Sequence, residues 1–280
     1  MIDSINANRL KLPLTGVTPG RPLIIGHRGA ASHFPENTIP AFLAAIRTGA
    51  NAIELDVRLT RDGALVVIHD ETVDRTTSGS GRISELTLAQ VKALDAGYCF
   101  SPDQGRTFPF RNRNVRVPTL AEVLSATEGT MIFLELKGSS RKLADAVIAC
   151  LIETKALDRV LIQTIGASHG LARYLRKKDR RLLVGHSCFE IGLFFALSVL
   201  HLERLFKPRG PSFEIPPRKF GLSFLSPFFV RRAQKAGVSV IVWTVDDQPT
   251  LSKCMDLAID GVITNDPART QKLKTTAFQL

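Results

Sequence analysis

The chain has 280 residues and a mass of 30.7 kDa, which is long for one small domain and typical of an α/β barrel. Hydrophobic residues make up 44% of the sequence and charged residues 22%, and this composition excludes a disordered, collagen-like or coiled-coil chain. The formal net charge of +11 favours anionic partners.

Eight short runs rich in Ile, Val and Leu recur along the chain, and most are bounded by Gly or Pro. Such runs are typical of strands buried on both faces of a parallel sheet. Helix-compatible stretches separate them, and this alternation predicts a (β/α)₈ TIM barrel. The predicted strands are residues 23–27, 51–57, 130–136, 159–164, 181–185, 212–215, 238–244 and 261–264.

Helices are expected at residues 39–48, 120–126, 141–154 and 228–235. Thr38 and Thr119 precede two of them and are residue types that cap helix N-termini. Pro227 lies in the first turn of the last helix, and Gly237 closes it.

A further strand-like run, residues 64–69, begins only six residues after Val57. A parallel crossover needs a dozen residues or more, so this run is expected to fold back as an antiparallel hairpin on the second strand. The sequence Arg61-Asp62-Gly63 supplies the turn. This register places His69 near Leu55.

Residues 71–117 are too long for an ordinary βα loop and contain a short helix near 88–94. We interpret them as a small insertion over the barrel mouth, within one domain that spans residues 1–280.

Acidic side chains gather at the ends of two neighbouring barrel strands. Glu54 and Asp56 are two residues apart and point to one face of a strand, and Glu135 ends the next barrel strand. Three converging carboxylates repel one another unless a cation joins them, and oxygen ligands favour Mg²⁺ or Ca²⁺. The alternative is that Glu135 pairs with Lys137 while Glu54 and Asp56 are solvated.

Two histidines also end predicted strands, where TIM barrels carry their catalytic groups. Histidine is the side chain whose ordinary pKa lies near neutral, so His27 and His69 suit general acid and base roles. Arg28 and Lys137 are cations suited to phosphate oxygens, and Trp243 offers a flat wall to a polyol or alkyl group. Together these residues predict a metal-dependent phosphodiesterase.

Five segments closely resemble the glycerophosphodiester phosphodiesterase family. They are IIGHRGAASHFPENTIPAF (24–42), AIELDVRLTRDGALVVIHDETVDRTTSGSGRI (52–83), FLELK (133–137), VWTVDD (242–247) and DGVITNDP (260–267). The resemblance covers nearly the whole chain. It implies a barrel of the phospholipase C-like phosphodiesterase type that releases sn-glycerol 3-phosphate and an alcohol.

The resemblance also implies roles for individual residues. His27 and His69 match the catalytic acid/base pair, Glu54, Asp56 and Glu135 match the metal ligands, and Arg28 and Lys137 match the phosphate contacts. Glu36 and Asn37 match supporting positions, although Asn37 also suits a helix cap. The chain departs from the family at Thr164-Ile165, where members usually have Ser-Phe, and substrate preference is open there.

An alternative function is a lysophospholipase D-like activity at a membrane surface. Between residues 170 and 235 there are 14 Lys and Arg against 4 Asp and Glu, and apolar stretches at 189–202 and 221–229 precede basic residues. This pattern suits peripheral contact with an anionic membrane, or an outer barrel helix and a loop packed on the core. The basic cluster at 176–181 lacks interleaved aromatics, so no nucleic-acid partner is expected.

Four widely spaced cysteines form no CxxC pair, and the N-terminal residues contain no apolar signal segment. No apolar run reaches the ~18 residues that a spanning helix needs. We therefore expect reduced thiols in a cytoplasmic protein.

Overall fold

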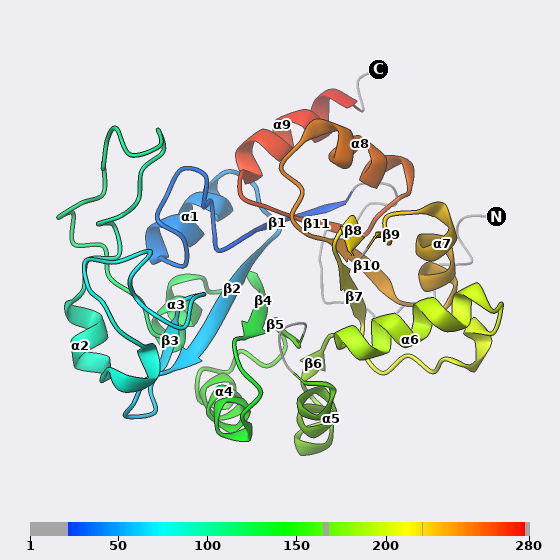
Figure 1. Ribbon diagram of the computed structural model, residues 1–280, viewed down its shortest axis with the longest axis horizontal. Coiled ribbons are helices and arrows are strands. Elements are labelled where there is room, and N and C mark those ends of the chain that lie inside the picture. Colours follow the sequence, from blue (N-terminus) through cyan, green and yellow to red (C-terminus); the bar gives the residue numbers. More distant parts are fainter. Residues whose placement is uncertain (1–21, 165–167, 220, 278–280) are drawn as a thin grey trace.

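A computed structural model describes residues 22–164, 168–219 and 221–277 of the chain (Figure 1). Eight parallel strands pair in the order β6-β5-β4-β2-β1-β11-β10-β7, and helices surround them, as the predicted (β/α)₈ barrel requires. These strands are β1 (Leu23–Gly26), β2 (Ala52–Leu59), β4 (Met131–Leu136), β5 (Val160–Gln163), β6 (Leu183–Val184), β7 (Ser212–Ile215), β10 (Ser239–Val242) and β11 (Gly261–Thr264).

The two ends of this strand path meet between β6 and β7. No ladder joins these strands in the described residues, but the His186 backbone N–H donates to the Ser212 carbonyl across 3.2 Å. A Cβ on Gly210 would lie 2.3 Å from the Val184 carbonyl oxygen, so the two segments approach closely. The barrel is therefore closed by a narrow seam, and β6 is shorter than the predicted strand 181–185.

Helices follow the strands and begin at side-chain caps. Thr38 accepts a hydrogen bond from the Ala41 N–H, and Thr119 forms a reciprocal capping box with Glu122, as their residue types predict. The helices are α1 (Ile39–Arg47), α2 (Leu88–Ala93), α3 (Leu120–Ala126), α4 (Arg141–Glu153), α5 (His169–Lys178), α6 (Cys188–Val199), α7 (Pro227–Lys235), α8 (Gln248–Asp256) and α9 (Pro267–Ala277), with 3₁₀ turns η1 (Ile83–Glu85) and η2 (Glu203–Leu205).

The predicted hairpin is present. Strand β3 (Leu65–Val67) pairs antiparallel with β2, with Val67 opposite Val57. The Ile68 N–H donates to the Asp56 carbonyl across 2.9 Å, so the same register continues and brings His69 to the level of Leu55. A second small hairpin, β8 (Arg218–Lys219) and β9 (Leu222–Ser223), follows β7.

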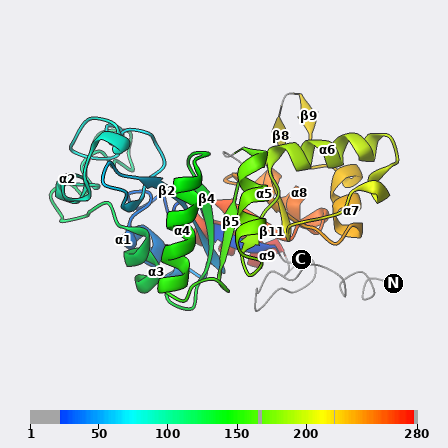
Figure 2. The same cartoon turned by 90° about the horizontal axis from the view of Figure 1, so that it is seen from below.

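Residues 71–117 carry η1 and α2 and pack around an apolar cluster of their own. The cluster includes Val73, Ile83, Val91 and Val115, and it joins the barrel through Val66 of β3. Both views place α2 at one end of the molecule and α6 at the opposite end (Figures 1 and 2). These residues thus pack on the side of the barrel that carries β3, and their role as an insertion over the barrel mouth stays a prediction.

The core has an inner and an outer part. Ile25, Phe133, Leu161, Ile241 and Ile263 fill the barrel interior. The outward faces of the strands pack against the helices, and burial of each large aliphatic or aromatic side chain contributes roughly 1.5–3 kcal/mol. This rigid frame fixes where the strand ends, and their side chains, lie.

Among the described residues, no disulfide joins Cys99, Cys150, Cys188 or Cys254. Among these residues, no helix has the length and apolar character that crossing a membrane requires.

Candidate active site

Three carboxylates meet where β2 runs past the carboxyl end of β4. Asp56 of β2 pairs in register with Glu135 of β4, and Glu54 lies on the same face two residues earlier. One oxygen of each of these carboxylates lies within 4.8 Å of the other two. Glu54 and Asp56 are only 3% and 1% exposed, so water does not solvate them as the alternative interpretation required.

The three carboxylates of this cluster repel one another, and a nearby positive charge would stabilise their ionised forms. Burial raises the pKa of Glu54 well above its ordinary value, and the charges of Asp56 and Glu135 raise it further. The buried Asp56 Oδ1 accepts no hydrogen bond among the described residues, although Lys137 Nζ lies 3.1 Å away. Three carboxylates placed this closely form an all-oxygen set that fits a hard divalent cation.

Lys137 lies on the cluster and pairs with both strands. Its Nζ is 3.0 Å from Glu135 Oε1 as well as close to Asp56. Burial by itself would lower the pKa of Lys137, but these two carboxylates raise it, and the amine stays charged. The pairing of Glu135 with Lys137, which belongs to the alternative interpretation, is therefore present, but it offsets only part of the negative charge.

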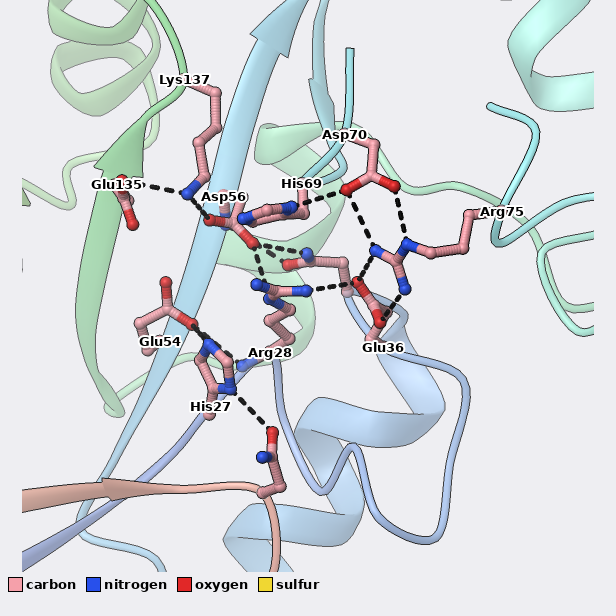
Figure 3. A network of polar contacts seen from close by, with 12 residues as sticks. His27, Arg28, Glu36, Glu54, Asp56, His69, Asp70, Arg75, Glu135 and Lys137 are labelled. Atoms are coloured by element: carbon pink, nitrogen blue, oxygen red, sulfur yellow. Dashed lines mark hydrogen bonds and ion pairs between the residues drawn. The ribbon is translucent and has the colours of Figure 1, made fainter. Parts of the chain in front are cut away.

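His27 follows β1 and faces the same cluster. Its Nε2 lies 4.0 Å from Glu54 Oε2, and its Nδ1 is 2.7 Å from the Asn265 side-chain oxygen (Figure 3). Asp246 fixes this amide, because its two carboxylate oxygens accept from the Asn265 Nδ2 and backbone N–H across 2.6 and 2.8 Å. Burial, with the neighbouring Arg28 charge, lowers the pKa of His27.

Arg28 adopts a left-handed backbone conformation, with φ of +53°. This turn aims its N–H at Glu54 Oε2 across 3.0 Å, while the guanidinium lies 3.2 Å from Asp56 and 2.7 Å from Glu36. The next residue must be glycine, since its φ is +89° and a Cβ there would lie 2.5 Å from the Ala41 carbonyl carbon. The His-Arg-Gly sequence thus folds tightly over α1.

His69 lies on the other side of Asp56 and is held by a chain of ion pairs (Figure 3). Its Nδ1 is 2.6 Å from Asp70 Oδ1, and Arg75 of the insertion donates to both Asp70 and Glu36. Burial would raise the pKa of Glu36, but hydrogen bonds and charge from Arg75 and Arg28 outweigh it and lower this pKa to about 2. Arg75 of the insertion therefore holds Asp70, and through Asp70 the imidazole of His69, in place.

Asn37 supports a metal-ligand candidate. Thr38, not Asn37, provides the side-chain cap of α1. The Asn37 Nδ2 donates to Asp56 Oδ2 across 2.8 Å, and its side-chain oxygen accepts from the Asp56 N–H across 3.3 Å. Asn37 therefore fixes the orientation of the Asp56 carboxylate.

Trp243 lies apart from this polar network. It follows β10 and packs on the apolar side chains inside the barrel. Its buried indole Nε1 finds no acceptor among the described residues. The Thr164 hydroxyl, at the position where the sequence departs from its family, is also buried without a described partner. Ile165 lies outside the described residues.

The structure thus brings together nine of the ten residues singled out in the sequence, and it adds four more. Asn265 and Asp246 hold His27, and Asp70 and Arg75 hold His69. All four lie within the quoted motifs, but only the fold shows which histidine each one serves.

Comparison with known proteins decides the family. The sequence model of the Glycerophosphoryl diester phosphodiesterase family matches residues 27–187 and 204–269. The chain belongs to this family. Both histidines and all three carboxylates lie within the matched residues, and this family member is a phosphoric diester hydrolase.

Individual relatives agree with this assignment. A glycerophosphodiester phosphodiesterase of Caldanaerobacter subterraneus is 35% identical over 252 residues, covering 88% of this chain and 95% of the relative. The crystal structure of a glycerophosphoryl diester phosphodiesterase domain from Mycobacterium tuberculosis matches with a TM-score of 0.79 at 22% identity. The match covers 90% of this chain and 98% of that domain, and it supports the assignment of the barrel fold. An Oleispira antarctica phosphodiesterase, solved in complex with the product sn-glycerol-3-phosphate, has a TM-score of 0.71 at 25% identity, covering 90% and 96%.

Proposed function

We propose that the protein hydrolyses glycerophosphodiesters to sn-glycerol 3-phosphate and an alcohol, with two histidines acting beside a bound divalent cation. The observation that carries the proposal is the placement of His27 and His69 on either side of a buried three-carboxylate cluster (Figure 3). The product complex of the Oleispira antarctica relative supports the glycerol phosphate half of the substrate.

Glu54, Asp56 and Glu135 are the residues that would hold Mg²⁺ or Ca²⁺. When bound, the cation would polarise the phosphodiester and lower the pKa of a hydroxyl on it. Asn37 keeps the Asp56 carboxylate in place, and the Arg28 backbone N–H does the same for Glu54. These contacts leave the carboxylates little freedom to rearrange, which favours preorganised binding.

The two histidines would exchange protons with the nucleophile and the leaving alcohol. The Asn265 oxygen accepts from Nδ1 of His27, and the Asp70 carboxylate accepts from Nδ1 of His69. Each imidazole therefore presents its Nε2 for proton transfer.

The cations at the mouth would bind the phosphate. Arg28 and Lys137 carry positive charge next to the carboxylate cluster and would offset charge that develops on the phosphoryl oxygens. Trp243 would form one wall of the substrate site, where its unpaired indole N–H suits a hydroxyl of a polyol.

The test is release of product from glycerophosphocholine with Mg²⁺, with Ca²⁺ and with EDTA. We expect cleavage with one of the cations, and none with EDTA. Cleavage that is unaffected by EDTA would contradict the metal requirement. No cleavage of glycerophosphocholine or glycerophosphoethanolamine with either cation would contradict the proposed substrate class.

A lysophospholipid is the second candidate substrate, because the outer face of α6 is apolar. Phe189, Leu193 and Val199 are 60%, 42% and 54% exposed. Exposed apolar side chains of this kind favour peripheral contact with a lipid surface. Lysophosphatidylcholine assayed beside glycerophosphocholine separates the two candidates, since faster turnover of the lysolipid would make it the preferred substrate. The cytoplasmic location stays a prediction.

A further inference from the structure

Helix α6 has no polar outer face. Its solvent-facing residues after the first position are Phe189, Gly192, Leu193, Ala196 and Val199. Its inner face is also mostly apolar, with Ile191 and Phe194 packed in the core. A helix that is apolar on all sides is expected to be covered on all sides. The neighbouring helix α5, in contrast, exposes Arg173, Lys177 and Lys178, as an ordinary outer barrel helix does.

The apolar surface continues beyond α6. Ten large hydrophobic residues of the described chain are well exposed, and only Tyr98 and Ile152 lie outside residues 189–228. Figure 2 shows α6 beside the β8–β9 hairpin and α7 at one end of the molecule. We call this region the α6 surface, and its exposed apolar residues are Phe189, Leu193, Val199, Leu200, Leu202, Leu205, Leu222 and Phe228.

Basic residues flank the α6 surface. Between residues 200 and 235 the chain has eight Lys and Arg against two Asp and Glu, and Glu214 is buried. The other acid, Glu203, lies 3.5 Å from Arg232. A second copy of this chain docked through the same face would bring two sets of these cations together, which is unfavourable. An anionic lipid surface complements both the charge and the apolar side chains.

The α6 surface begins at the same end of the barrel as the candidate active site. The β6–α6 connection and the β8–β9 hairpin both follow the carboxyl ends of their strands, where His27, Glu54 and Glu135 also lie. The Phe189 ring at the start of α6 lies 4.8 Å from the His169 ring, which starts α5 after β5. A lipid surface at α6 would therefore be next to the barrel mouth.

We propose that the α6 surface docks the protein onto an anionic bilayer, with α6 lying in the interface. Twelve residues are too few to span a bilayer, whereas an apolar helix flanked by cations suits the headgroup boundary. The inference rests on the proposed phosphodiesterase function for its purpose, since docking brings the mouth to substrates that are embedded in lipid. The docking itself depends on the α6 surface and its flanking cations, and not on catalysis.

Co-sedimentation of the full chain with phosphatidylcholine vesicles and with phosphatidylcholine–phosphatidylglycerol vesicles tests the inference. We expect salt-sensitive binding to the anionic vesicles only. Phe189→Ser with Leu193→Ser should lower the partition coefficient at least ~10-fold, through loss of buried apolar area. Arg204→Gln with Lys207→Gln should lower it about fivefold per cation. Hydrolysis of glycerophosphocholine should stay at the wild-type rate in both variants.

The matched controls lie on α4, away from the α6 surface. Ile152 is 47% exposed, so Ile152→Ser removes a comparable apolar side chain, and Arg141→Gln with Lys142→Gln removes two exposed cations. Equal loss of binding in the controls, or wild-type binding in the α6 variants, would overturn the inference. So would a wild-type dimer that the α6 variants convert to monomer without any vesicle binding. Vesicle binding by a protein that cleaves no phosphodiester would instead count against the proposed function alone.

Discussion

The side-chain oxygen of Asn265 lies 2.7 Å from Nδ1 of His27, across 238 residues of sequence. The amide cannot turn over, because its Nδ2 donates to Asp246 across 2.6 Å. Asn265 therefore presents an acceptor to His27 and holds the imidazole proton on Nδ1. In the other proposed catalytic histidine, His69, the carboxylate of Asp70 takes the equivalent place beside Nδ1.

Removing this amide should slow catalysis without weakening substrate binding. Asn265 contacts His27 and not the carboxylate cluster, so Asn265→Ala is expected to lower kcat about 10–100-fold while KM changes little. Asp246→Asn should act in the same direction, since it no longer holds the amide in one orientation. Steady-state kinetics on glycerophosphocholine measure kcat and KM separately and so test this prediction.

His33 provides the control for that experiment. It lies in the loop before α1, and its Nε2 pairs with Asp266 across 3.0 Å at the surface. His33→Ala should leave both kcat and KM unchanged. If Asn265→Ala raised KM as much as it lowered kcat, or changed neither, the positioning role would be wrong.

Loss of either proposed catalytic histidine should be more severe. His27→Ala and His69→Ala are each expected to lower kcat at least ~100-fold, because general acid and base catalysis contributes about that much or more. Neither imidazole packs in the apolar core, so both variants should keep a wild-type unfolding temperature. Near-wild-type turnover in either variant would remove that residue from the mechanism.

The carboxylate cluster should make stability depend on divalent cations. Glu54 and Asp56 are buried beside Glu135, so a cation that binds only the folded state is expected to raise the melting temperature. At a concentration 100 times its Kd the gain is about 2.7 kcal/mol. Thermal unfolding with EDTA, Mg²⁺ or Ca²⁺ measures this without any assay of activity.

Glu54→Gln and Glu135→Gln are the matched variants for the metal prediction. Each keeps the side-chain shape but weakens the ligand set, so the cation-dependent rise in melting temperature should be lost or greatly reduced. A wild-type protein whose melting temperature is the same with EDTA and with both cations would contradict the assignment of the cluster as a metal site.

Much of this site could be predicted from the sequence because parallel strands end at one edge. Once Glu54, Asp56 and Glu135 were placed at the ends of neighbouring strands, the barrel topology brought them together. The short Arg61-Asp62-Gly63 connection required a hairpin, which then placed His69. Local spacing and chain length sufficed for these relationships.

Other features depend on contacts between distant segments. The pairing of His27 with Asn265 joins the first and last strands of the barrel, and Arg75 reaches Glu36 from the insertion. Side-chain direction in loops decides such contacts, and residue spacing does not reveal it. The sequence also left the exposure of α6 undecided, since an apolar run at 189–202 suits either a membrane-facing surface or an outer helix packed on the core.

The buried carboxyl of Glu214 should make the stability of the protein depend on pH, apart from any effect of pH on catalysis. It lies at the β6–β7 seam, where Ser212 donates a hydrogen bond to it and its Oε2 has no described partner. Burial outweighs the Ser212 hydrogen bond and raises the pKa of Glu214 to about 8. The folded protein therefore keeps this carboxyl protonated at neutral pH, whereas the unfolded chain ionises it near its ordinary value of 4.5.

Whether this carboxyl makes the protein more or less stable as pH rises depends on which state, folded or unfolded, binds the extra proton. From about pH 4.5 to about 8 the folded state holds one proton more than the unfolded chain, so the contribution of Glu214 to the free energy of unfolding falls as pH rises. Glu214→Gln mimics the neutral acid and should remove this component. Between about pH 5 and about pH 8, the stability of the variant relative to wild type should rise by a few kcal/mol.

Urea denaturation of both proteins across this range measures the difference, in which the other titrating groups cancel. Glu214→Gln can be less stable than wild type at the acid end, because the variant places two amide N–H donors at the buried seam, and a buried donor without an acceptor is costly. The prediction concerns only the slope of the difference with pH. Parallel stability curves would show that Glu214 ionises alike in both states, and hence that water reaches the β6–β7 seam in the folded protein.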